Sequence, residues 1–218
     1  MAKFLTAVDD LTRPDHSYLD SADACYFHGE YTARHSYAHS ATNQLISNLK
    51  KSPLKRGLPE YRYKVQAIAE AATILRRGIN AEAFANITFI PVPPSRAKGD
   101  PEYDDRMVKV TRAICEGNLG ETRELVIQRE NCEASHLSEH RPRPQDLVAL
   151  YEIQENLCAG VRELIVVVDD MLTTGCHFAA MKSVLLARFP DANVIGLFVA
   201  RRVPEHAPPT PLGFGGAD

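Results

Sequence analysis

The 218-residue sequence contains no apolar run long enough for a signal peptide or for a membrane span. Neither sign of charge dominates, because 25 Lys and Arg stand against 28 Asp and Glu and give a net charge of -3. This balance provides no global case for binding nucleic acid or a membrane, so partners must be inferred from local patches. We found no internal repeat. The length suits one α/β domain with a small embellishment.

Disulfide signals are also missing. The five cysteines form no Cys-x-x-Cys pair and are odd in number, which favours reduced thiols in a cytoplasmic protein that does not associate with membranes. Cys25 and His28, followed by His35 and His39, have zinc-ligand chemistry at zinc-like separations. A metal site there stays open, and so does the alternative that these side chains simply pack or belong to an N-terminal substrate-selecting element.

Strand-like apolar runs alternate along the chain with segments of helical periodicity. The expected strands are 87–93, 125–128, 147–153, 164–170 with the two acids at its end, and 194–200. The expected helices are 40–51, 59–77, 106–115 and 176–189. On the second helix, an apolar face is expected at Val65, Ile68, Ala69, Ala72 and Leu75 or Ile74. The alternation predicts an α/β fold with a doubly wound, mainly parallel sheet.

The chain divides by composition into three parts. We expect a lead-in with a helical element over 1–80, an α/β core over 81–203 and a mobile Pro- and Gly-rich tail over 204–218. The polar segment 129–146 is too long for an ordinary connection and is either a functional lid or a disordered loop.

The most informative run extends from Leu164 to Gly175. Five apolar residues lead into Asp169 and Asp170, and a Thr-Thr-Gly turn then precedes a helix. Such a turn offers backbone N-H groups, hydroxyls and a helix N-terminus to a phosphate, whereas the carboxylates suit sugar hydroxyls or a divalent cation. A phosphorylated ribose carries both kinds of group.

Three other interpretations of this run compete with a phosphate-sugar site. A receiver domain needs about 100 residues after its paired acids, and only 171–218 remain. A P-loop ATPase needs a Gly-x-x-x-x-Gly-Lys-Ser/Thr loop upstream, and the sequence has none. The plainest alternative is that Asp170 and Thr173 merely cap a helix.

A second loop has suitable chemistry. Residues 94–100 supply two cations and a glycine beside prolines that stiffen the turn, as a pyrophosphate-binding loop would require. Ligands of such sheets bind beyond the carboxyl ends of the strands, so we expect the loops after Pro93, Gln128 and Asp170 to converge. An exposed basic surface loop is the competing interpretation.

The Asp-Asp-x-x-Thr-Thr-Gly run resembles the phosphoribosyl-pyrophosphate (PRPP) motif of type I phosphoribosyltransferases. Further features resemble the ComF-type branch of that superfamily over about Tyr37 to Arg202: Pro91-Val92-Pro93, Lys98-Gly99, Arg129, Leu137-Ser138 and Arg141. The chain departs from this branch in lacking its N-terminal four-cysteine zinc module. It also has Cys176-His177 where the family usually has a small residue and then Thr or Ser.

The resemblance implies a Mg²⁺-dependent transfer of 5-phosphoribosyl from PRPP to a nitrogenous base or amine, with release of pyrophosphate. It places Asp169 and Asp170 against the ribose hydroxyls and Mg²⁺, and it places catalytic arginines, Arg129 and Arg141, in the lid. His136, His140 and Arg143 lie in the same segment. The 5′-phosphate would be bound by Thr173, Thr174, Gly175, Cys176 and His177, and the pyrophosphate by Ser95, Arg96, Lys98 and Gly99. The acceptor and the oligomeric state, including a homo-oligomer, stay open.

Other functions stay open beside the transferase. One is a PRPP sensor or a nucleic-acid-associated accessory or effector protein, in DNA uptake or bacterial defence; another is a hydrolase that acts on PRPP without an acceptor. A basic cluster interleaved with Tyr61 and Tyr63 bears on nucleic-acid binding. Its members are Lys50, Lys51, Lys55, Arg56, Arg62 and Lys64. Such clusters can bind single strands, but a solvated helix face explains this one better.

Overall fold

The computed structural model describes residues 4–117, 120–131 and 142–204. Its main sheet has the strand order β1-β2-β8-β7-β3-β4, and every neighbouring pair is parallel except β1 with β2. These strands are β1 (Thr6–Ala7), β2 (Cys25–Thr32), β3 (Ile87–Pro91), β4 (Glu121–Thr122), β7 (Leu164–Leu172) and β8 (Asn193–Val203). The expected α/β class and mainly parallel sheet are confirmed.

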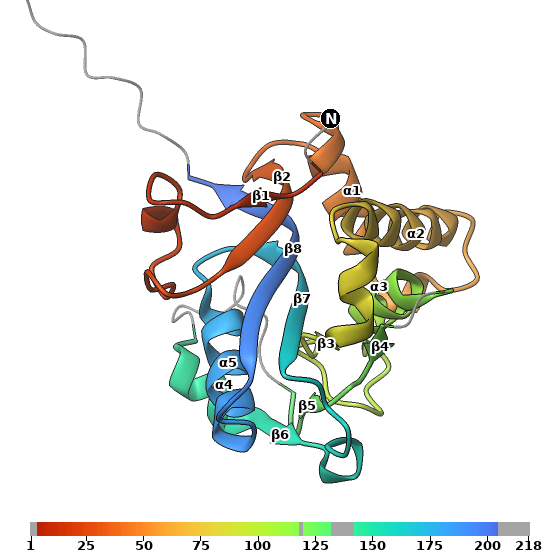
Figure 1. Cartoon of the computed structure of the whole chain (residues 1–218). Helices are drawn as coiled ribbons and strands as arrows, with labels where there is room; N and C mark the ends of the chain where they lie inside the picture. Colours follow the sequence, from red (N-terminus) through yellow and green to blue (C-terminus); the bar gives the residue numbers. More distant parts are fainter. Residues whose placement is uncertain (1–3, 118–119, 132–141, 205–218) are drawn as a thin grey trace, which may run out of the picture.

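Helices cover both faces of this sheet (Figure 1). One face carries α1 (Ala41–Leu49), α2 (Tyr61–Arg77) and α3 (Arg106–Cys115). The other carries α4 (Pro144–Leu150), α5 (Cys176–Arg188) and a two-stranded antiparallel sheet of β5 (Val126–Gln128) and β6 (Tyr151–Ile153). Four short 3-10 helices lie in the connections: η1 (Arg13–Asp15), η2 (Pro53–Lys55), η3 (Ala81–Asn86) and η4 (Glu155–Leu157).

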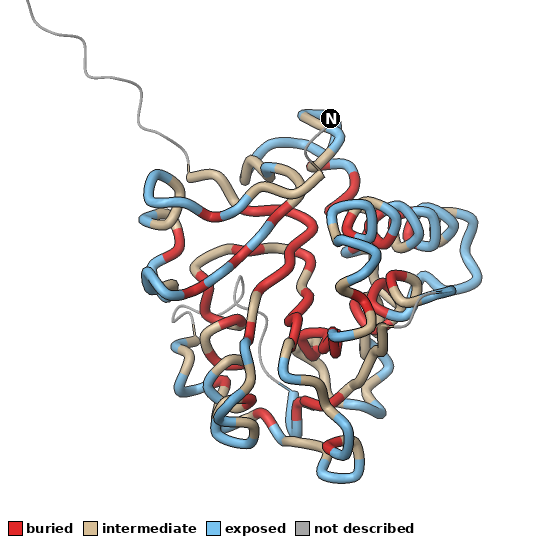
Figure 2. Tube along the Cα trace, in the orientation of Figure 1, coloured by how far each residue is buried: buried red, intermediate tan, exposed pale blue. Residues whose placement is uncertain are grey.

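The central strand β7 is apolar on both faces, and its side chains alternate between two cores. Ile165 and Val167 pack into the core under α5, whereas Val166 and Val168 pack into the core under α1, α2 and α3. All four are buried. Figure 2 shows the buried segments following the central strands, with exposed segments outside them.

The strand was expected to end in the two acids, with a loop after Asp170, but β7 continues two residues further to Leu172. β8 stays in register beside it, with Asp169 opposite Phe198 and Leu172 opposite Arg201. The two carboxylates are therefore part of an extended strand, which turns their side chains to opposite faces.

The expected strand over 147–153 was also largely wrong. Residues 144–150 form α4, and only the last three residues are strand β6. Pro144 occupies the first helical turn, and the Asp146 carboxylate accepts a hydrogen bond from the Arg143 N-H at 2.8 Å. Both features favour a helix start, which the short apolar run did not reveal.

The expected inward face of α2 was partly wrong. Ala72 and Leu75 are buried as expected, but Val65 is 56% exposed and Lys64 is only 1% exposed. Small side chains allow α2 to approach α1 and α3 closely, and Lys64 fills the space near its first turn. Its ammonium donates to Leu49 O at 2.8 Å and Lys51 O at 2.7 Å, and pairs with Asp104 at 2.7 Å. Burial lowers the pKa of Lys64, and Asp104 opposes that shift.

The N-terminal segment contributes to the main sheet, since β2 pairs in parallel with β8. Most of the tail 204–218 and the middle of the expected lid, 132–141, lie outside the described residues. Within the described ranges, no helix combines the length and apolar character needed to cross a membrane.

Replacing Lys64 by Met tests the buried ammonium. The change removes the donor from the Leu49 and Lys51 carbonyl groups and takes one of two cations from Asp104, so we expect a loss of about 3–5 kcal/mol in the free energy of unfolding, measured by urea denaturation. Lys55→Met removes an exposed ion pair with Glu60 and should cost less than about 1 kcal/mol. Equal losses for both variants would contradict the role given to Lys64.

Candidate active site

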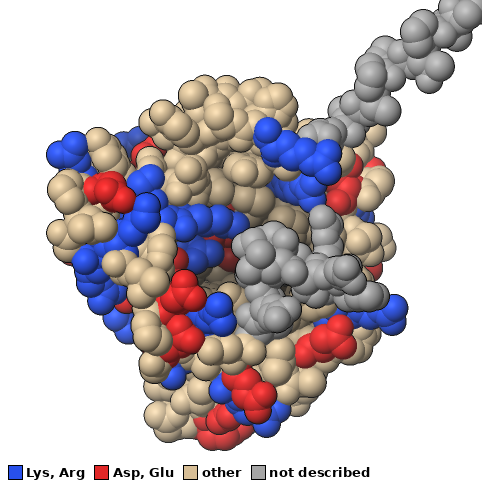
Figure 3. Space-filling view, turned by 180° about the vertical axis from the view of Figure 1, so that it is seen from behind, with Lys and Arg blue, Asp and Glu red and all other residues tan. Residues whose placement is uncertain are grey.

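The carboxyl ends of β3 and β7 meet where the sequence predicted convergence. Pro91 is opposite Val168, and the Val92 N-H donates to Val168 O at 2.9 Å. The loop after β3 therefore starts beside the two carboxylates of β7. On the face turned toward the reader in Figure 3, Lys and Arg side chains gather around a hollow.

Asp170 carries a buried negative charge, with only 3% of the residue exposed. Arg106 donates to Asp170 Oδ2 from Nε at 2.9 Å and from Nη2 at 2.7 Å, and Lys50 Nζ lies 3.5 Å from Oδ1. Burial alone would raise the pKa of Asp170, but Lys50 and Arg106 outweigh it and lower the pKa to about 2. Asp170 is therefore ionised at neutral pH.

Asp169 behaves differently. Its Oδ1 accepts a hydrogen bond from the Asp170 N-H at 2.7 Å. Burial and the negative charge of Asp170 raise the pKa of Asp169 to about 7. Neighbouring carboxyl groups with pKa values pushed apart are typical of sites that bind cations or transfer protons.

These carboxylates fit Mg²⁺ by their donor chemistry. Mg²⁺ prefers oxygen ligands and is usually bound by one or two carboxylates together with oxygens of the substrate. Among the described residues, no group of three or more His, Cys, Asp or Glu side chains could hold a metal. Since these two side chains lie on opposite faces of β7, a metal at this edge would take an oxygen from one of them and complete its coordination with oxygens of a ligand.

The turn from Thr173 to Gly175 leads into α5, and Gly175 has a left-handed backbone with φ of +83°. No side chain of the described residues caps α5, so its first N-H groups are available to an anion. The hydroxyls of Thr173 and Thr174 likewise have no hydrogen-bond partner within the described part of the chain.

Cys176 and His177 turn their side chains toward the small sheet and α4. The Cys176 thiol donates to Pro142 O at 3.1 Å, and His177 Nδ1 lies 3.0 Å from the Tyr151 hydroxyl. Burial raises the pKa of Cys176 to about 11 and lowers the pKa of His177. At neutral pH both side chains are uncharged, so these two residues can serve an anion through their backbone N-H groups.

An N-terminal strap, which we define as residues 12–20, holds the turn from its other side. His16 is fully buried and its Nδ1 contacts Thr173 O, while the Tyr18 N-H donates to Thr174 O at 2.9 Å. Leu19 lies so close to Gly175 that an added Cβ would come within 2.8 Å of it. The strap thus occupies the carbonyl groups of the turn, and the segment's lack of periodicity gave no sequence signal for this role.

The loop after β3 is held by its backbone. Ser95 O accepts from Gln128 Nε2 at 2.9 Å, and the Ala97 N-H donates to Asn131 Oδ1 at 2.8 Å. Gly99 has φ of +101°. The two cations form exposed ion pairs: Arg96 with Glu102 at 3.3 Å and Lys98 with Glu124 at 3.2 Å. Such pairs are weak, so an incoming anion can displace the carboxylates.

Of the two arginines expected in the lid, only Arg129 is described. Its guanidinium donates to Ala149 O at 2.6 Å, at the end of α4, and its N-H donates to Leu150 O. Arg141, His136, His140 and the Leu137-Ser138 pair lie outside the described residues. Arg143 precedes α4.

Sequence reasoning missed two site cations. Lys50 was assigned to a solvated basic face, and Arg106 was seen only as the start of an amphipathic helix. Of the six-residue basic cluster, Lys50 and Lys64 point inward, whereas Lys55 forms an exposed pair with Glu60. The consecutive charges Asp104-Asp105-Arg106 at a helix start were the one signal that could have indicated a polar site there.

The zinc interpretation gains no support. Cys25 is buried in β2, and His28 Nδ1 lies 3.0 Å from Phe4 O. His35 and His39 precede α1 instead of lying on it, although their rings are 4.2 Å apart. These residues form no three-ligand cluster within the described ranges.

Comparison with known protein families gave no matching family model, and no curated protein is significantly similar in sequence.

His16 generates a pH prediction. Burial lowers its pKa below the ordinary value of 6.5, so below about pH 6.5 the unfolded chain binds a proton that the folded protein does not. Stability is therefore lost as pH falls through this window, by up to about 1.4 kcal/mol per pH unit. His16→Asn, whose amide can still donate to Thr173 O, should flatten this dependence in urea denaturation between pH 7.5 and 5.5.

The control is His28→Asn, because His28 also contacts a backbone carbonyl through Nδ1 but is only partly buried. It should retain the wild-type pH dependence. A wild-type slope in His16→Asn would contradict a neutral, buried His16.

Proposed function

We propose that this protein is a Mg²⁺-dependent, PRPP-binding protein of the type I phosphoribosyltransferase kind, with the closest resemblance to the ComF-type branch. One observation carries the proposal. Two adjacent carboxylates, half-buried Asp169 and buried Asp170, are followed directly by a turn suited to a phosphate at the end of the central strand, and a phosphorylated ribose carries groups for both. Neither half alone would identify the ligand.

Each part of PRPP has a matching part of the site. The 5′-phosphate is assigned to the Thr and backbone N-H groups of 173–177, where a helix N-terminus and a left-handed glycine favour an anion. The ribose hydroxyls are assigned to Asp169 and Asp170. The pyrophosphate is assigned to the loop of Ser95, Arg96, Lys98 and Gly99, whose weak ion pairs can be given up.

The reaction follows from that arrangement. A nitrogen of the acceptor forms a bond to C1 of the ribose, and the bond from C1 to the pyrophosphate oxygen breaks with its electrons going to the leaving group. Bound Mg²⁺ would neutralise that leaving group. The chain's own contribution is to orient the ribose through its acids and to place cations near the developing negative charge. Arg129 and Arg141 stay candidates for closing the site against water.

A second candidate is a PRPP-sensing protein without turnover, of the accessory or effector kind. The engagement of Asp170 by two cations favours it, because a ribose or metal must compete with Arg106 and Lys50 for that carboxylate. The nucleic-acid version of this candidate has less support, since Lys64 is buried and the half-exposed Lys50 is directed at Asp170.

Binding calorimetry with PRPP and Mg²⁺ tests the ligand. Wild-type protein should bind PRPP, and Asp169→Asn and Asp170→Asn should each weaken binding at least about tenfold, which corresponds to about 1.4 kcal/mol. Asp105→Asn is the matched control, because Asp105 pairs with Lys109 on α3 and not with the site. Absence of PRPP binding, or equal binding by all variants, would refute the proposal.

Turnover is tested separately. PRPP consumption is measured against a panel of purine and pyrimidine bases, and pyrophosphate release is measured without acceptor. Consumption that depends on a base supports the transferase, release without a base supports a hydrolase, and binding without either supports a sensor. Gel shifts with single-stranded DNA and RNA, at two salt concentrations, check the nucleic-acid version.

A further inference from the structure

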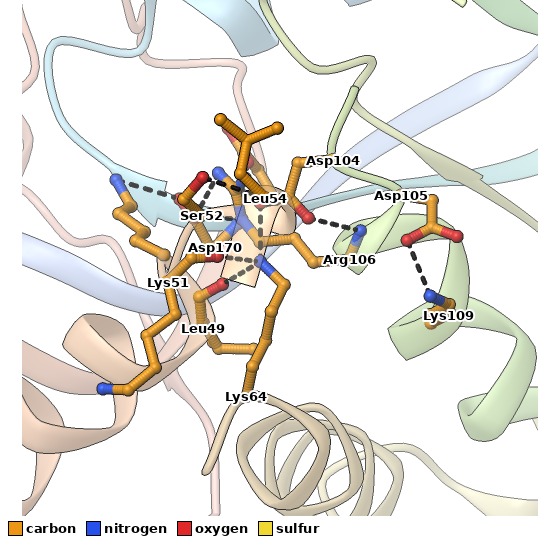
Figure 4. A network of polar contacts seen from close by, with 12 residues as sticks. Leu49, Lys51, Ser52, Leu54, Lys64, Asp104, Asp105, Arg106, Lys109 and Asp170 are labelled. Carbon is orange, nitrogen blue, oxygen red and sulfur yellow. Dashed lines mark hydrogen bonds and ion pairs between the residues drawn. The ribbon is translucent and has the colours of Figure 1, made fainter. Parts of the chain in front are cut away.

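Five side chains of alternating charge form a continuous chain beside the candidate site. Figure 4 labels Lys64, Asp104, Arg106 and Asp170 of this chain. Lys64 pairs with Asp104 at 2.7 Å, and Arg106 Nη1 lies 2.8 Å from the same Asp104 oxygen. Arg106 then pairs with Asp170 at 2.7 Å, and Lys50 approaches the other oxygen of Asp170 at 3.5 Å. The order of charges is therefore positive, negative, positive, negative, positive.

The two cations next to Asp170 are braced by one buried group. The Lys64 ammonium donates to Leu49 O and Lys51 O, the carbonyls on either side of Lys50 at the end of α1. Through Asp104, the same ammonium also fixes the guanidinium of Arg106 at the start of α3. Lys64 thus fixes the backbone that carries Lys50 and orients the guanidinium of Arg106 beside Asp170.

Both oxygens of Asp170 are taken by these cations. Two N-H groups of Arg106 point at Oδ2, and Lys50 faces Oδ1. A metal cation arriving alone would meet two positive charges at a mostly buried carboxylate, where repulsion is weakly screened. An anion arriving alone would find the cations already paired.

We propose that Arg106 and Lys50 form a latch on Asp170 that makes Mg²⁺ binding conditional on a diphosphate. When a Mg²⁺-diphosphate complex enters, the two cations exchange the carboxylate for diphosphate oxygens, and Mg²⁺ takes their place at Asp170. The number of opposite-charge contacts is conserved in this exchange, whereas either ion alone loses contacts. Arg106 and Lys50 thereby select a metal-diphosphate over free Mg²⁺ or free anion. The choice of ions rests on the proposed function.

The two cations differ in exposure and therefore contribute unequally to the latch. The Arg106 side chain is 19% exposed and makes two short contacts, whereas the Lys50 side chain is 45% exposed and makes one long contact. Arg106 is the main component, and Lys50 is free to swing toward an incoming anion.

The experiment is calorimetry with three probes: Mg²⁺ alone, inorganic pyrophosphate with EDTA, and a preformed one-to-one Mg²⁺-pyrophosphate complex. Wild-type protein should bind the complex at least tenfold more tightly than either ion. Arg106→Gln should bind Mg²⁺ alone severalfold more tightly and the complex at least fivefold more weakly. Lys50→Gln, a half-exposed change that the fold tolerates, should shift both affinities in the same directions by smaller factors.

Lys109→Gln is the matched control, because Lys109 lies one turn further along α3 and, among the described residues, forms its ion pair with Asp105. It should behave as the wild type. The latch is overturned if Arg106→Gln and Lys50→Gln gain no Mg²⁺ affinity, or if wild-type protein binds Mg²⁺ alone as tightly as the complex.

Parallel titrations with PRPP separate this inference from the proposed function. Wild-type binding of Mg²⁺-PRPP, with unchanged metal affinity in both variants, would overturn the latch and leave the function standing. Conditional binding of Mg²⁺-pyrophosphate without any binding of PRPP would overturn the function and leave the latch standing.

Discussion

The buried negative charge of Asp170 is the constraint on which this end of the molecule depends. A carboxylate with 3% exposure is stable as an ion only if cations compensate for its lost hydration. Those cations come from α1 and α3, which are distant from β7 in the sequence. Because Arg106 and Lys50 must reach the same carboxylate, the end of α1 and the start of α3 are fixed relative to the sheet. The buried Lys64 follows from this requirement, since it holds both segments.

The same strand explains why the site lies where it does. β7 packs apolar side chains against helices on both faces, so charged groups are tolerated only at its carboxyl end. The polar turn that follows is shaped from the N-terminal side, where His16 and Tyr18 occupy its carbonyl groups. The strap engages these carbonyl groups. Because no side chain of the described residues caps α5, its first N-H groups are available to a ligand. Segments from both ends of the chain thus prepare one anion-accepting turn.

Local patterns predicted much of the fold. The limits of α1, α3 and α5 agree with the expected helices to within two residues, because capping residues and apolar spacing are local signals. The strand expected from Leu147 to Ile153 was wrong for most of its length, because a short apolar segment is compatible with either a helix or a strand. In the site, the acids and the Thr-Thr-Gly turn were recognisable as one continuous segment. Their partners were not, since nothing local distinguishes Lys50, which faces Asp170, from Lys55, which pairs in solvent.

Charge balance connects these features to the ligand. Lys64 and Asp104 neutralise each other, so Arg106 and Lys50 face Asp170 with one positive charge in excess, which Asp169 offsets when it is ionised. A lone cation adds to this excess where water is largely excluded, and a lone anion must draw Arg106 and Lys50 away from Asp170 and leave that carboxylate uncompensated. A ligand that brings a metal ion together with its phosphates supplies a cation for Asp170 and anions for Arg106 and Lys50 at the same time. The electrostatics that stabilise the folded end of the sheet therefore also favour a metal-phosphate ligand over its separate parts.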